Sequence, residues 1–263
     1  MATTLAQMML LVMEATTDVI RGDATVSDTS KVALIDRKRD ESGGYYDDGI
    51  IFFLSGDNDG LTRLIKRWDA DAKSFHFEDV TANVAAGDDY AVCVDYPRSQ
   101  VIQAINEAYR VLKLPAYSTR ITNTGALSYA LPDGVDNVIA VDVDQGGDDD
   151  RWQAHHNWEV IGDTLYFDPQ TQPDTAKGQI RLLHIDSPAR VDTDAGVLNR
   201  HVSDEYITWA SATKLLEWRS KKFNGEDRKV EADLNVARQK ADEFKDEQPE
   251  IDKMERTPHL SRW

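Results

Sequence analysis

Cysteine is almost absent from this chain of 263 residues, and its scarcity limits the chemistry that holds the fold together. The single residue, Cys93, lies in the apolar run Tyr90–Val94 and has no second thiol to pair with in the chain. A cysteine in such a run is typical of a small buried hydrophobe rather than a reactive thiol. The sequence therefore calls for no internal disulfide and no oxidising compartment.

Long apolar runs are also missing. The N-terminal run Met8–Met13 is far shorter than the roughly 20 residues that a membrane span needs. No basic segment precedes it and Glu14 follows at once, so a secretory signal is not indicated. We expect a buried helix at this position, a protein made in the cytoplasm and no membrane partner.

Catalytic and cofactor-binding motifs are absent from the sequence as well. It contains no phosphate-binding Gly-x-x-x-x-Gly-Lys-Ser/Thr loop, no Gly-x-Gly-x-x-Gly, no Gly-x-Ser-x-Gly and no His-Glu-x-x-His. His155 and His156 are adjacent, so their side chains diverge on either a strand or a helix. We interpret them as solvated loop residues and not as a metal pair. The sequence predicts no enzyme, and no catalytic, cofactor-binding or metal-binding residue.

Two acidic clusters have a possible metal-binding interpretation. Asp57–Gly60 resembles the opening of a calcium loop, but the twelfth position is Trp68, where a bidentate Glu is required. A turn between strands is the interpretation we favour. The stretch 133–150 holds seven aspartates and no Lys or Arg, which indicates a solvated loop, with adventitious divalent-cation binding as the alternative.

Positive charge is in short supply, and the deficit is unevenly placed. The net charge is −17, from 47 acidic and 30 basic residues. Residues 203–247 hold 11 acids and 9 bases and residues 248–263 hold three of each, so residues 1–202 carry −15. Such a surface repels nucleic acid and disfavours a protein that grips DNA. It is compatible with a channel wall past which DNA slides without specific binding.

Four segments have the apolar spacing of amphipathic helices. Their stripes include Leu5, Met8 and Val12 near the N-terminus, and the final two stripes run from Val202 to Phe223 and from Val230 to Phe244. Gly225 separates the last two and Pro249 ends the series. Because each helix has one apolar stripe to bury, we expect a helical bundle assembled from residues 1–20, 97–114 and 202–248.

Two β-rich stretches separate these helices. Residues 22–48 read as a long loop in which Lys31–Ile35 can form a short strand, and residues 49–96 read as a β-meander. Residues 120–192 form a β-rich module in which Gly162-Asp163 has the spacing of a tight hairpin. The predicted fold class is α+β, a noncontiguous four-helix bundle with an inserted antiparallel β-meander and a β-sandwich-like module.

The C-terminal segment, residues 249–263, is expected to be an extended arm. It places apolar and aromatic side chains beside arginines, the residue types that dominate interface hot spots. A frayed chain end is the alternative. The candidate partner-docking residues are Met254, Arg256, His259, Leu260, Arg262 and Trp263.

The order and texture of these elements resemble the head-to-tail adaptor (connector) proteins of tailed bacteriophages. The stretches that carry the likeness are Tyr96–Ala108, Tyr129–Val138, Gly162–Phe167 and Ile207–Leu216. The resemblance runs over most of residues 90–225 and has no invariant signature. The meander Gly49–Tyr96 and the size of the second β-rich module depart from a minimal adaptor, which leaves the position in the neck open.

The resemblance implies a structural protein of the virion neck, at the interface of head and tail, made in the host cytoplasm. Its copies would form a dodecameric ring beneath the portal protein and a conduit for DNA. The expected partners are the portal, neighbouring copies of the chain and downstream tail or nozzle proteins, with terminal extensions that grip neighbours.

Two other functions remain open at this point. Trp152, Trp158, Tyr166 and Phe167 form an aromatic group that could be a sugar-stacking platform of a carbohydrate- or host-surface-binding module, although core packing is the interpretation we favour. A hydrolase with a carboxylate pair is the third possibility. The 47 acids guarantee random pairs, so sequence alone gives no signal for it.

Overall fold

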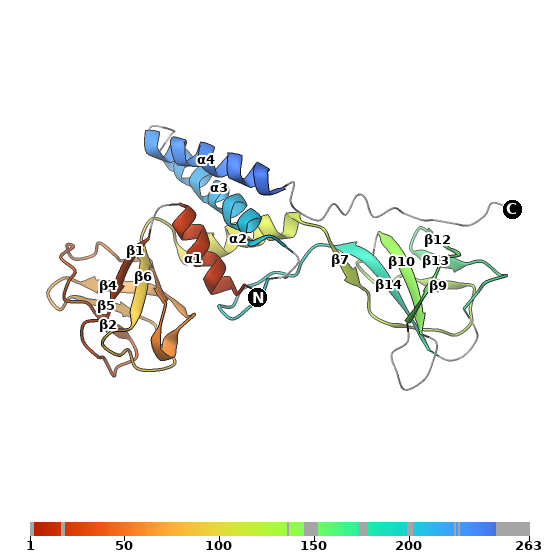
Figure 1. Cartoon of the computed structure of the whole chain (residues 1–263), viewed down its shortest axis with the longest axis horizontal. Helices are drawn as coiled ribbons and strands as arrows, with labels where there is room; N and C mark the ends of the chain where they lie inside the picture. Colours follow the sequence, from red (N-terminus) through yellow and green to blue (C-terminus); the bar gives the residue numbers. More distant parts are fainter. Residues whose placement is uncertain are drawn as a thin grey trace. The chain divides into compact units, whose positions relative to one another are not determined.

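The structure is a computed structural model of the whole chain (Figure 1). It describes residues 3–16, 19–135, 137–144, 152–173, 178–198, 202–223, 225 and 227–245. The fold is mixed α+β, with four α-helices and antiparallel sheets in the described residues, which confirms the predicted class. The chain divides into two compact units, and the first is discontinuous: residues 1–110 and 189–249 form unit 1, and the intervening residues 111–188 lie in unit 2.

Unit 1 contains a six-stranded antiparallel sheet in the order β1-β6-β3-β4-β5-β2. The sheet curls into a half-barrel, and its two edges approach each other where Thr25 N donates to Ile35 O at 2.8 Å. The inner face carries the aromatic and β-branched side chains of the core, among them Trp68, Phe75 and Tyr90. The strands are β1 (Ile20–Asp23), β2 (Ala33–Ile35), β3 (Ile50–Phe53), β4 (Thr62–Asp69), β5 (Ser74–Phe77) and β6 (Asp89–Cys93).

A buried polar network closes one part of this half-barrel. Asp36 is 1% exposed and accepts hydrogen bonds from Tyr90 Oη at 2.6 Å and from Arg39 Nε at 3.2 Å. A buried carboxylate is costly unless it is paired and hydrogen-bonded, so these contacts are a condition for the loop 36–48 to cover the core. Burial, followed by the bond to Asp36, raises the pKa of Tyr90, which keeps its hydroxyl protonated as a donor.

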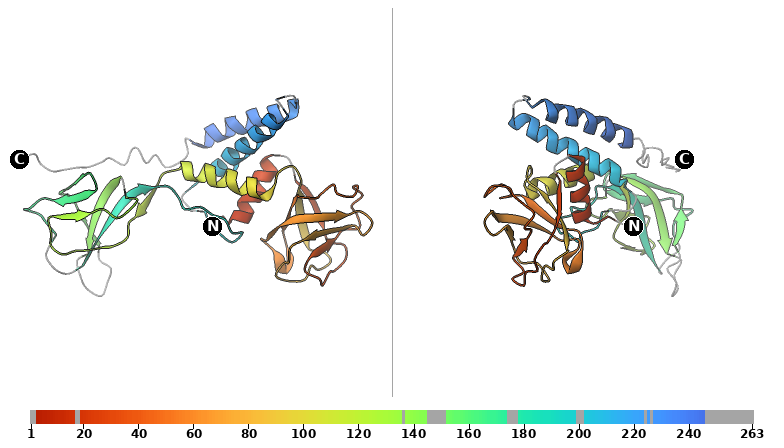
Figure 2. Two further views of the ribbon diagram at one scale, coloured as in Figure 1. Left: turned by 180° about the vertical axis from the view of Figure 1, so that it is seen from behind. Right: turned by 60° about the vertical axis from the view of Figure 1, so that its left-hand side comes forward.

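The four helices also belong to unit 1. Helix α3 packs against α4 over most of its length and against α1 in its first half, where Thr208 and Met8 meet (Figures 1 and 2). Helix α2 reaches α3 through the ion pair of Glu107 and Lys214 at 3.2 Å. No helix in the described residues is long and apolar enough to cross a membrane. The helices are α1 (Leu5–Ala15), α2 (Arg98–Val111), α3 (Asp204–Lys222) and α4 (Arg228–Lys245).

Unit 2 consists of two antiparallel sheets with one shared core. The larger sheet has the order β11-β10-β14-β7, with β8 also paired to β14, and the smaller has the order β12-β13-β9. Residues such as Val141, Leu165 and Leu182 from both sheets are fully buried together. The strands are β7 (Leu114–Tyr117), β8 (Ile121–Thr122), β9 (Ser128–Ala130), β10 (Val138–Asp144), β11 (Trp152–His155), β12 (Trp158–Ile161), β13 (Thr164–Phe167) and β14 (Gln179–Asp186).

Several local predictions are confirmed and others are wrong. The hairpin at Gly162-Asp163 is present, with Ile161 opposite Thr164. The short strand expected within Lys31–Ile35 is present as β2. The segment 22–48 is nevertheless not one long loop, because β1 extends into it and β1 and β2 form the two edges of the half-barrel. The helical segment 97–114 is too long, because α2 ends at Val111 and Leu114 already pairs with β14. The predicted domain boundaries as a whole stay a prediction.

Candidate interaction surfaces

The outer face of the larger sheet in unit 2 carries a stack of arginine and aromatic side chains. The guanidinium carbon of Arg181 lies 4.2 Å from the ring centroid of Tyr117 and 4.2 Å from that of Trp152. Arg120 lies over the same indole at 5.4 Å. Arg181 Nε also donates to Asp142 Oδ2 at 3.0 Å. Planar guanidinium groups stack on aromatic faces in this way, so Arg181 is fixed in position on three sides.

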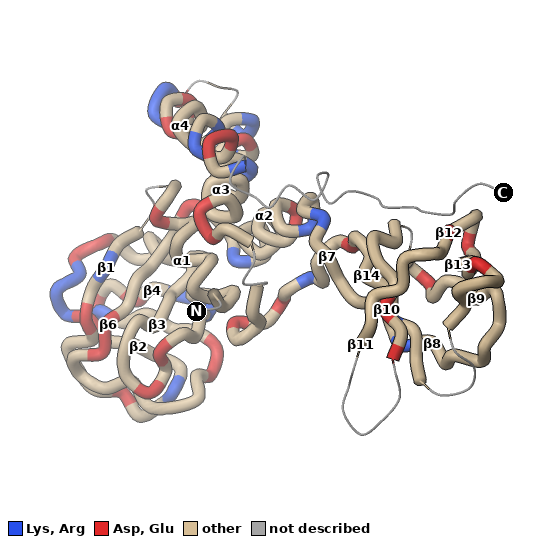
Figure 3. Tube along the Cα trace, turned by 45° about the vertical axis from the view of Figure 1, so that its right-hand side comes forward, with Lys and Arg blue, Asp and Glu red and all other residues tan. Residues whose placement is uncertain are grey.

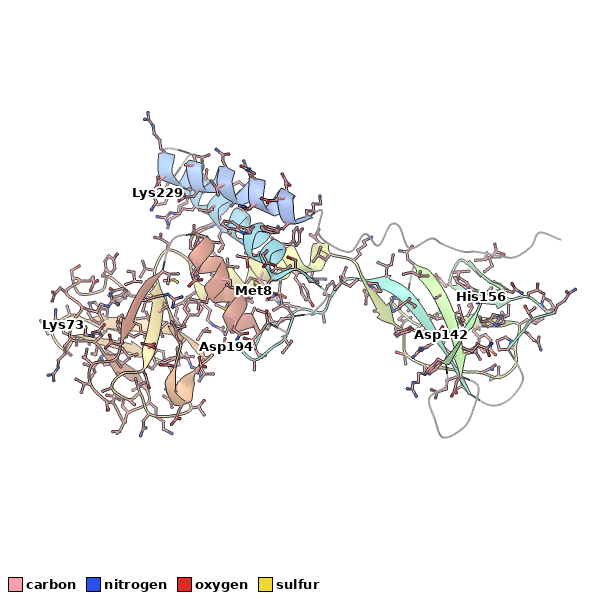
Figure 4. The ribbon with its side chains drawn as sticks, viewed as in Figure 1. Met8, Lys73, Asp142, His156, Asp194 and Lys229 are labelled. Atoms are coloured by element: carbon pink, nitrogen blue, oxygen red, sulfur yellow. The ribbon has the colours of Figure 1, made fainter. Side chains whose placement is uncertain are left out.

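The strand alternation explains why these residues share a face. In β14, residues 180, 182 and 184 are buried and the residues between them are half-buried. Arg181 stands directly opposite Asp142 of β10, whose side chain Figure 4 marks on this sheet. Tyr117 is 54% exposed, so the stack presents aromatic surface and guanidinium groups to the solvent. Tyr, Trp and Arg are the residue types that dominate interface hot spots, which makes this face a candidate docking surface.

The two adjacent histidines were predicted to be solvated loop residues, and the structure contradicts this for His155. His155 is the last residue of β11, and its ring contacts that of Phe167 with centroids 5.0 Å apart. Burial lowers the pKa of His155, and its Nε2 is buried without a hydrogen-bond partner in the described part of the chain. His156 is exposed, as predicted. The loop interpretation failed for His155 because the partner strand β10 lies 8 or more residues away across an acidic stretch.

The proposed sugar-stacking platform is broken up by the fold. Trp158 and Phe167 are 7% and 3% exposed and belong to the core between the sheets of unit 2, which confirms the core-packing interpretation for these two. Tyr166 is exposed on the opposite face of its strand. Trp152 lies under the two guanidinium groups described above. The four rings therefore do not form one surface.

In unit 1, the segment of residues 189–198, here called the return segment, joins elements from distant parts of the chain. Asp194 is its central residue: its carboxylate accepts hydrogen bonds from Thr62 Oγ1 at 2.7 Å, Thr62 N at 3.0 Å and Arg98 at 2.7 Å. Arg63 adds an ion pair at 3.5 Å. The carboxylate is 11% exposed, so these four contacts compensate its burial. Figure 4 marks Asp194 beside α1.

The ends of the return segment are held as firmly as its centre. Asn106 of α2 binds both backbone groups of Val191 at 2.8 Å each. Leu5 N at the start of α1 donates to Gly196 O at 2.8 Å. A Cβ at Gly196 would lie 2.5 Å from the Val191 side chain, so the close turn requires glycine. The return segment therefore binds α1, β4 and α2 to one another.

Two cavities border the return segment. One measures about 730 Å³ and the other about 350 Å³, within the range of roughly 300–1,000 Å³ that is usual for ligand sites. The three arginines of the larger cavity are already ion-paired, Arg63 and Arg98 with Asp194 and Arg190 with Asp192. The smaller cavity is mainly apolar, between α1 and the turn that joins β3 to β4. Neither arrangement identifies a ligand.

The two acidic clusters have structural roles where they are described. Asn58, inside the cluster Asp57–Gly60, is buried and binds the backbone of Ala82 and Asn83, so this stretch is the expected turn between strands. In the second cluster Asp142 pairs with Arg181, while residues 136 and 145–151 lie outside the described residues. Within the described ranges no group of three or more His, Cys, Asp or Glu side chains is arranged to hold a metal ion. Cys93 is buried, as expected.

The sequence-based candidates and the structural ones do not coincide. Met254, Arg256, His259, Leu260, Arg262 and Trp263 lie outside the described residues. Sequence reasoning missed Arg181, Tyr117, Asn106 and Asp194. The sequence did contain a signal for two of them. Arg181 is a polar residue between apolar ones in a strand of alternating burial, and Asn106 is a polar residue on the apolar face of a helix. Neither a scan against models of protein families nor a search of curated proteins found a match to this chain.

Proposed function

We propose that the chain is a head-to-tail adaptor of a tailed bacteriophage, a non-catalytic subunit of a ring beneath the portal protein that forms a conduit for DNA. The observation that carries this proposal is the discontinuous unit 1, in which the return segment contacts α1 and α2 and unit 2 is inserted between α2 and α3. Helices, an inserted β-rich module and a further pair of helices follow one another as in the family that the sequence resembles. The place of action would be the neck of the virion.

The proposal includes a finer description of the fold. In it α1, α2, α3 and α4 act as a noncontiguous four-helix bundle, and copies of this bundle build a dodecameric ring. The contacts of α3 with α1 and α4 and the ion pair of Lys214 with Glu107 of α2 support this description. The half-barrel would then be the meander-type insertion and unit 2 the sandwich-like one.

Charge supports the part of the proposal that concerns DNA. The net charge of −17 repels phosphates, so DNA passing through a ring of such subunits would meet no specific binding site. The arginines around the return segment are ion-paired to Asp194 and Asp192, so acids neutralise the positive charge that DNA phosphates would otherwise meet there. The remaining partners in the proposal are neighbouring copies, the portal and downstream tail or nozzle proteins.

The test is assembly with a portal. The purified chain is mixed with the portal of the same virus and examined by size-exclusion chromatography and negative-stain imaging, and the expected result is a ring on the portal. The chain without residues 250–263 tests the terminal arm, with loss of ring attachment expected. A free monomer that ignores the portal contradicts the adaptor function. Intact attachment of the shortened chain contradicts only the arm.

A carbohydrate- or host-surface-binding module of the tail or neck is the alternative function. The observation that favours it is the exposure of Tyr117 and Tyr166, which lie on two different strands of unit 2. Aromatic rings of this kind stack on sugars. Binding of the chain to host glycans, lost on replacement of these tyrosines and accompanied by indifference to the portal, would support this alternative over the adaptor.

A further inference from the structure

The smaller sheet of unit 2 has one face in the core and one face in the solvent. Along β13 the residues alternate strictly: Leu165 and Phe167 are buried, and Tyr166 between them is exposed. In β9 Tyr129 is buried between two exposed residues. This alternation is the pattern of an antiparallel sheet with one covered face. The outer face of β9, β12 and β13 is here called the small-sheet face.

The small-sheet face carries two large apolar side chains, Tyr166 on its middle strand and Ile161 beside the hairpin turn. Its cross-strand pairs form two rows, because residues directly opposite each other point to the same side. Ile161 is 59% exposed and Tyr166 is 39% exposed, and small side chains stand beside them. The rows are Ile161, Thr164 and Ala130, and Glu159, Tyr166 and Ser128.

The charges on and around this face have one sign. Residues 126–135 and 157–171, which contain its strands and turns, include no Lys or Arg and four acids, Asp133, Glu159, Asp163 and Asp168. Asp163 occupies the turn between β12 and β13, and Leu131 N donates to Asp163 O at 2.9 Å, which brings the 131–135 turn beside it. Figure 3 shows acidic residues and no basic ones along β12 and β13. Exposed apolar side chains flanked by charges of one sign are typical of a protein interface.

We infer that the small-sheet face docks a partner protein whose contact surface is apolar at its centre and carries Lys or Arg at its rim. Charge selects this occupant over a second copy of the chain, because two copies would set the same four acids against each other. Ile161 and Tyr166 supply the apolar contact, and Glu159 and Asp163 supply the attraction. This inference goes beyond the proposed function and stands whether or not the chain is an adaptor.

The neighbours of Tyr166 are suited to contact by another surface. Ser128 and Thr164 are small, so they leave the tyrosine ring accessible from above the sheet, and Tyr loses little conformational entropy when it is immobilised. The acids are spread over three turns and one strand, so basic groups on a partner can meet them from more than one side. Attraction of this kind acts mainly on the rate of association and weakens with salt.

The experiment uses the full chain and two synthetic peptides of equal length as probes. In one peptide Lys alternates with Ile and Tyr, and in the other Glu replaces every Lys. Binding is measured by calorimetry at low and high salt. We expect the Lys peptide to bind and the Glu peptide to show no binding. Ile161→Thr with Tyr166→Thr preserves the β-propensity of the strands and should weaken binding by about tenfold or more.

Two further variants complete the design. Asp163→Asn with Glu159→Gln leaves the apolar contact in place and should weaken binding and reduce its salt dependence. Val236→Thr replaces a side chain that is 52% exposed on α4 and serves as the matched control, with binding unchanged. Because the charge variant alters only exposed or half-buried positions, it tests the inference even if the apolar variant fails to fold.

Several results would overturn the inference. Docking of a basic partner is contradicted by any of three results. These are failure of the Lys peptide to bind, equal binding of both peptides, and binding that is unchanged in both face variants. Self-association of the wild-type chain that Tyr166→Thr abolishes assigns the face to a second copy instead. Salt-independent binding of a glycan at Tyr166 assigns it to carbohydrate. Each of these outcomes can be interpreted even if the chain forms no ring with the portal, because none of the measurements requires the portal.

Discussion

Asn106 of α2 binds both backbone groups of Val191, although the two residues are 85 positions apart in the sequence. The side-chain amide donates to Val191 O and its oxygen accepts from Val191 N, each at 2.8 Å. Unit 2 occupies the chain between these two residues, so this contact closes unit 1 at the point where the chain returns to it. The side chain thus substitutes for a strand partner that the return segment lacks here.

Replacing Asn106 with Leu should destabilise unit 1 selectively. The substitution keeps the side-chain volume and leaves the N–H and C=O of Val191 without their partner, at a cost of about 2–4 kcal/mol for the two groups. Hydrogen exchange read by mass spectrometry should show faster exchange in the return segment and α1, with unit 2 unchanged. Gln103→Leu, an exposed position on the same helix, is the matched control. Equal protection in both variants would contradict this role of Asn106.

Tyr90→Phe tests the buried network of the half-barrel. The hydroxyl donates to Asp36 Oδ2 at 2.6 Å and accepts from Arg39 Nε at 2.9 Å, and its removal leaves the 1%-exposed carboxylate with one donor fewer. We expect the free energy of unfolding to fall by about 1–3 kcal/mol. Denaturant unfolding followed by the fluorescence of the buried Trp68 gives the measurement. Tyr45→Phe, at an exposed ring, should change it by much less.

Local sequence signals predicted the parts of the fold that depend on near neighbours. The hairpin at Gly162-Asp163 needs only two residues with the right turn geometry, and Gly162 has φ of 58° as such a turn requires. The apolar spacing of residues 202–223 gave α3 within two residues at each end. These features are fixed by backbone conformation and periodicity, which a single sequence contains.

The missed features depend on pairing across long stretches of chain. Strand β7 has the sequence Leu-Pro-Ala-Tyr, with a proline and no alternation, and it becomes a strand because β14 lies beside it some 70 residues later. The same holds for the candidate surfaces. Arg181 is one ordinary polar residue of an alternating strand until the register places it between Tyr117 and Trp152. Register across the sheet, and not composition, creates that stack.

Mild acid should destabilise unit 2 through His155. Burial lowers the pKa of this ring in the folded state, so the unfolded chain binds the proton first as pH falls. The contribution of His155 to stability is therefore constant above its unfolded-state pKa of about 6.5. This contribution decreases as pH falls from there to the lowered pKa of the folded state. Protonation also places a donor at the buried, unpartnered Nε2.

Hydrogen exchange of β11–β13 between about pH 7.5 and about pH 5.5, corrected for the intrinsic rate, measures this loss of stability. His155→Leu should remove most of the pH dependence, and His156→Gln should retain it because that side chain is exposed. An unchanged pH profile in His155→Leu would assign the acid sensitivity of unit 2 to another group.

The stack on Arg181 predicts that arginine and lysine are not interchangeable at this position. Lysine keeps the charge but loses the planar group that lies 4.2 Å from both Tyr117 and Trp152, together with the two contacts to Asp142. We expect Arg181→Lys to lower the stability of unit 2 by about 1 kcal/mol or more and to change the fluorescence of Trp152. Arg120→Lys is the matched comparison, because its guanidinium lies 5.4 Å from the same ring and should contribute less. If both variants lose the same stability, the stacking of Arg181 between Tyr117 and Trp152 has no special role. Strand pairing alone would then hold the residues of this face in place.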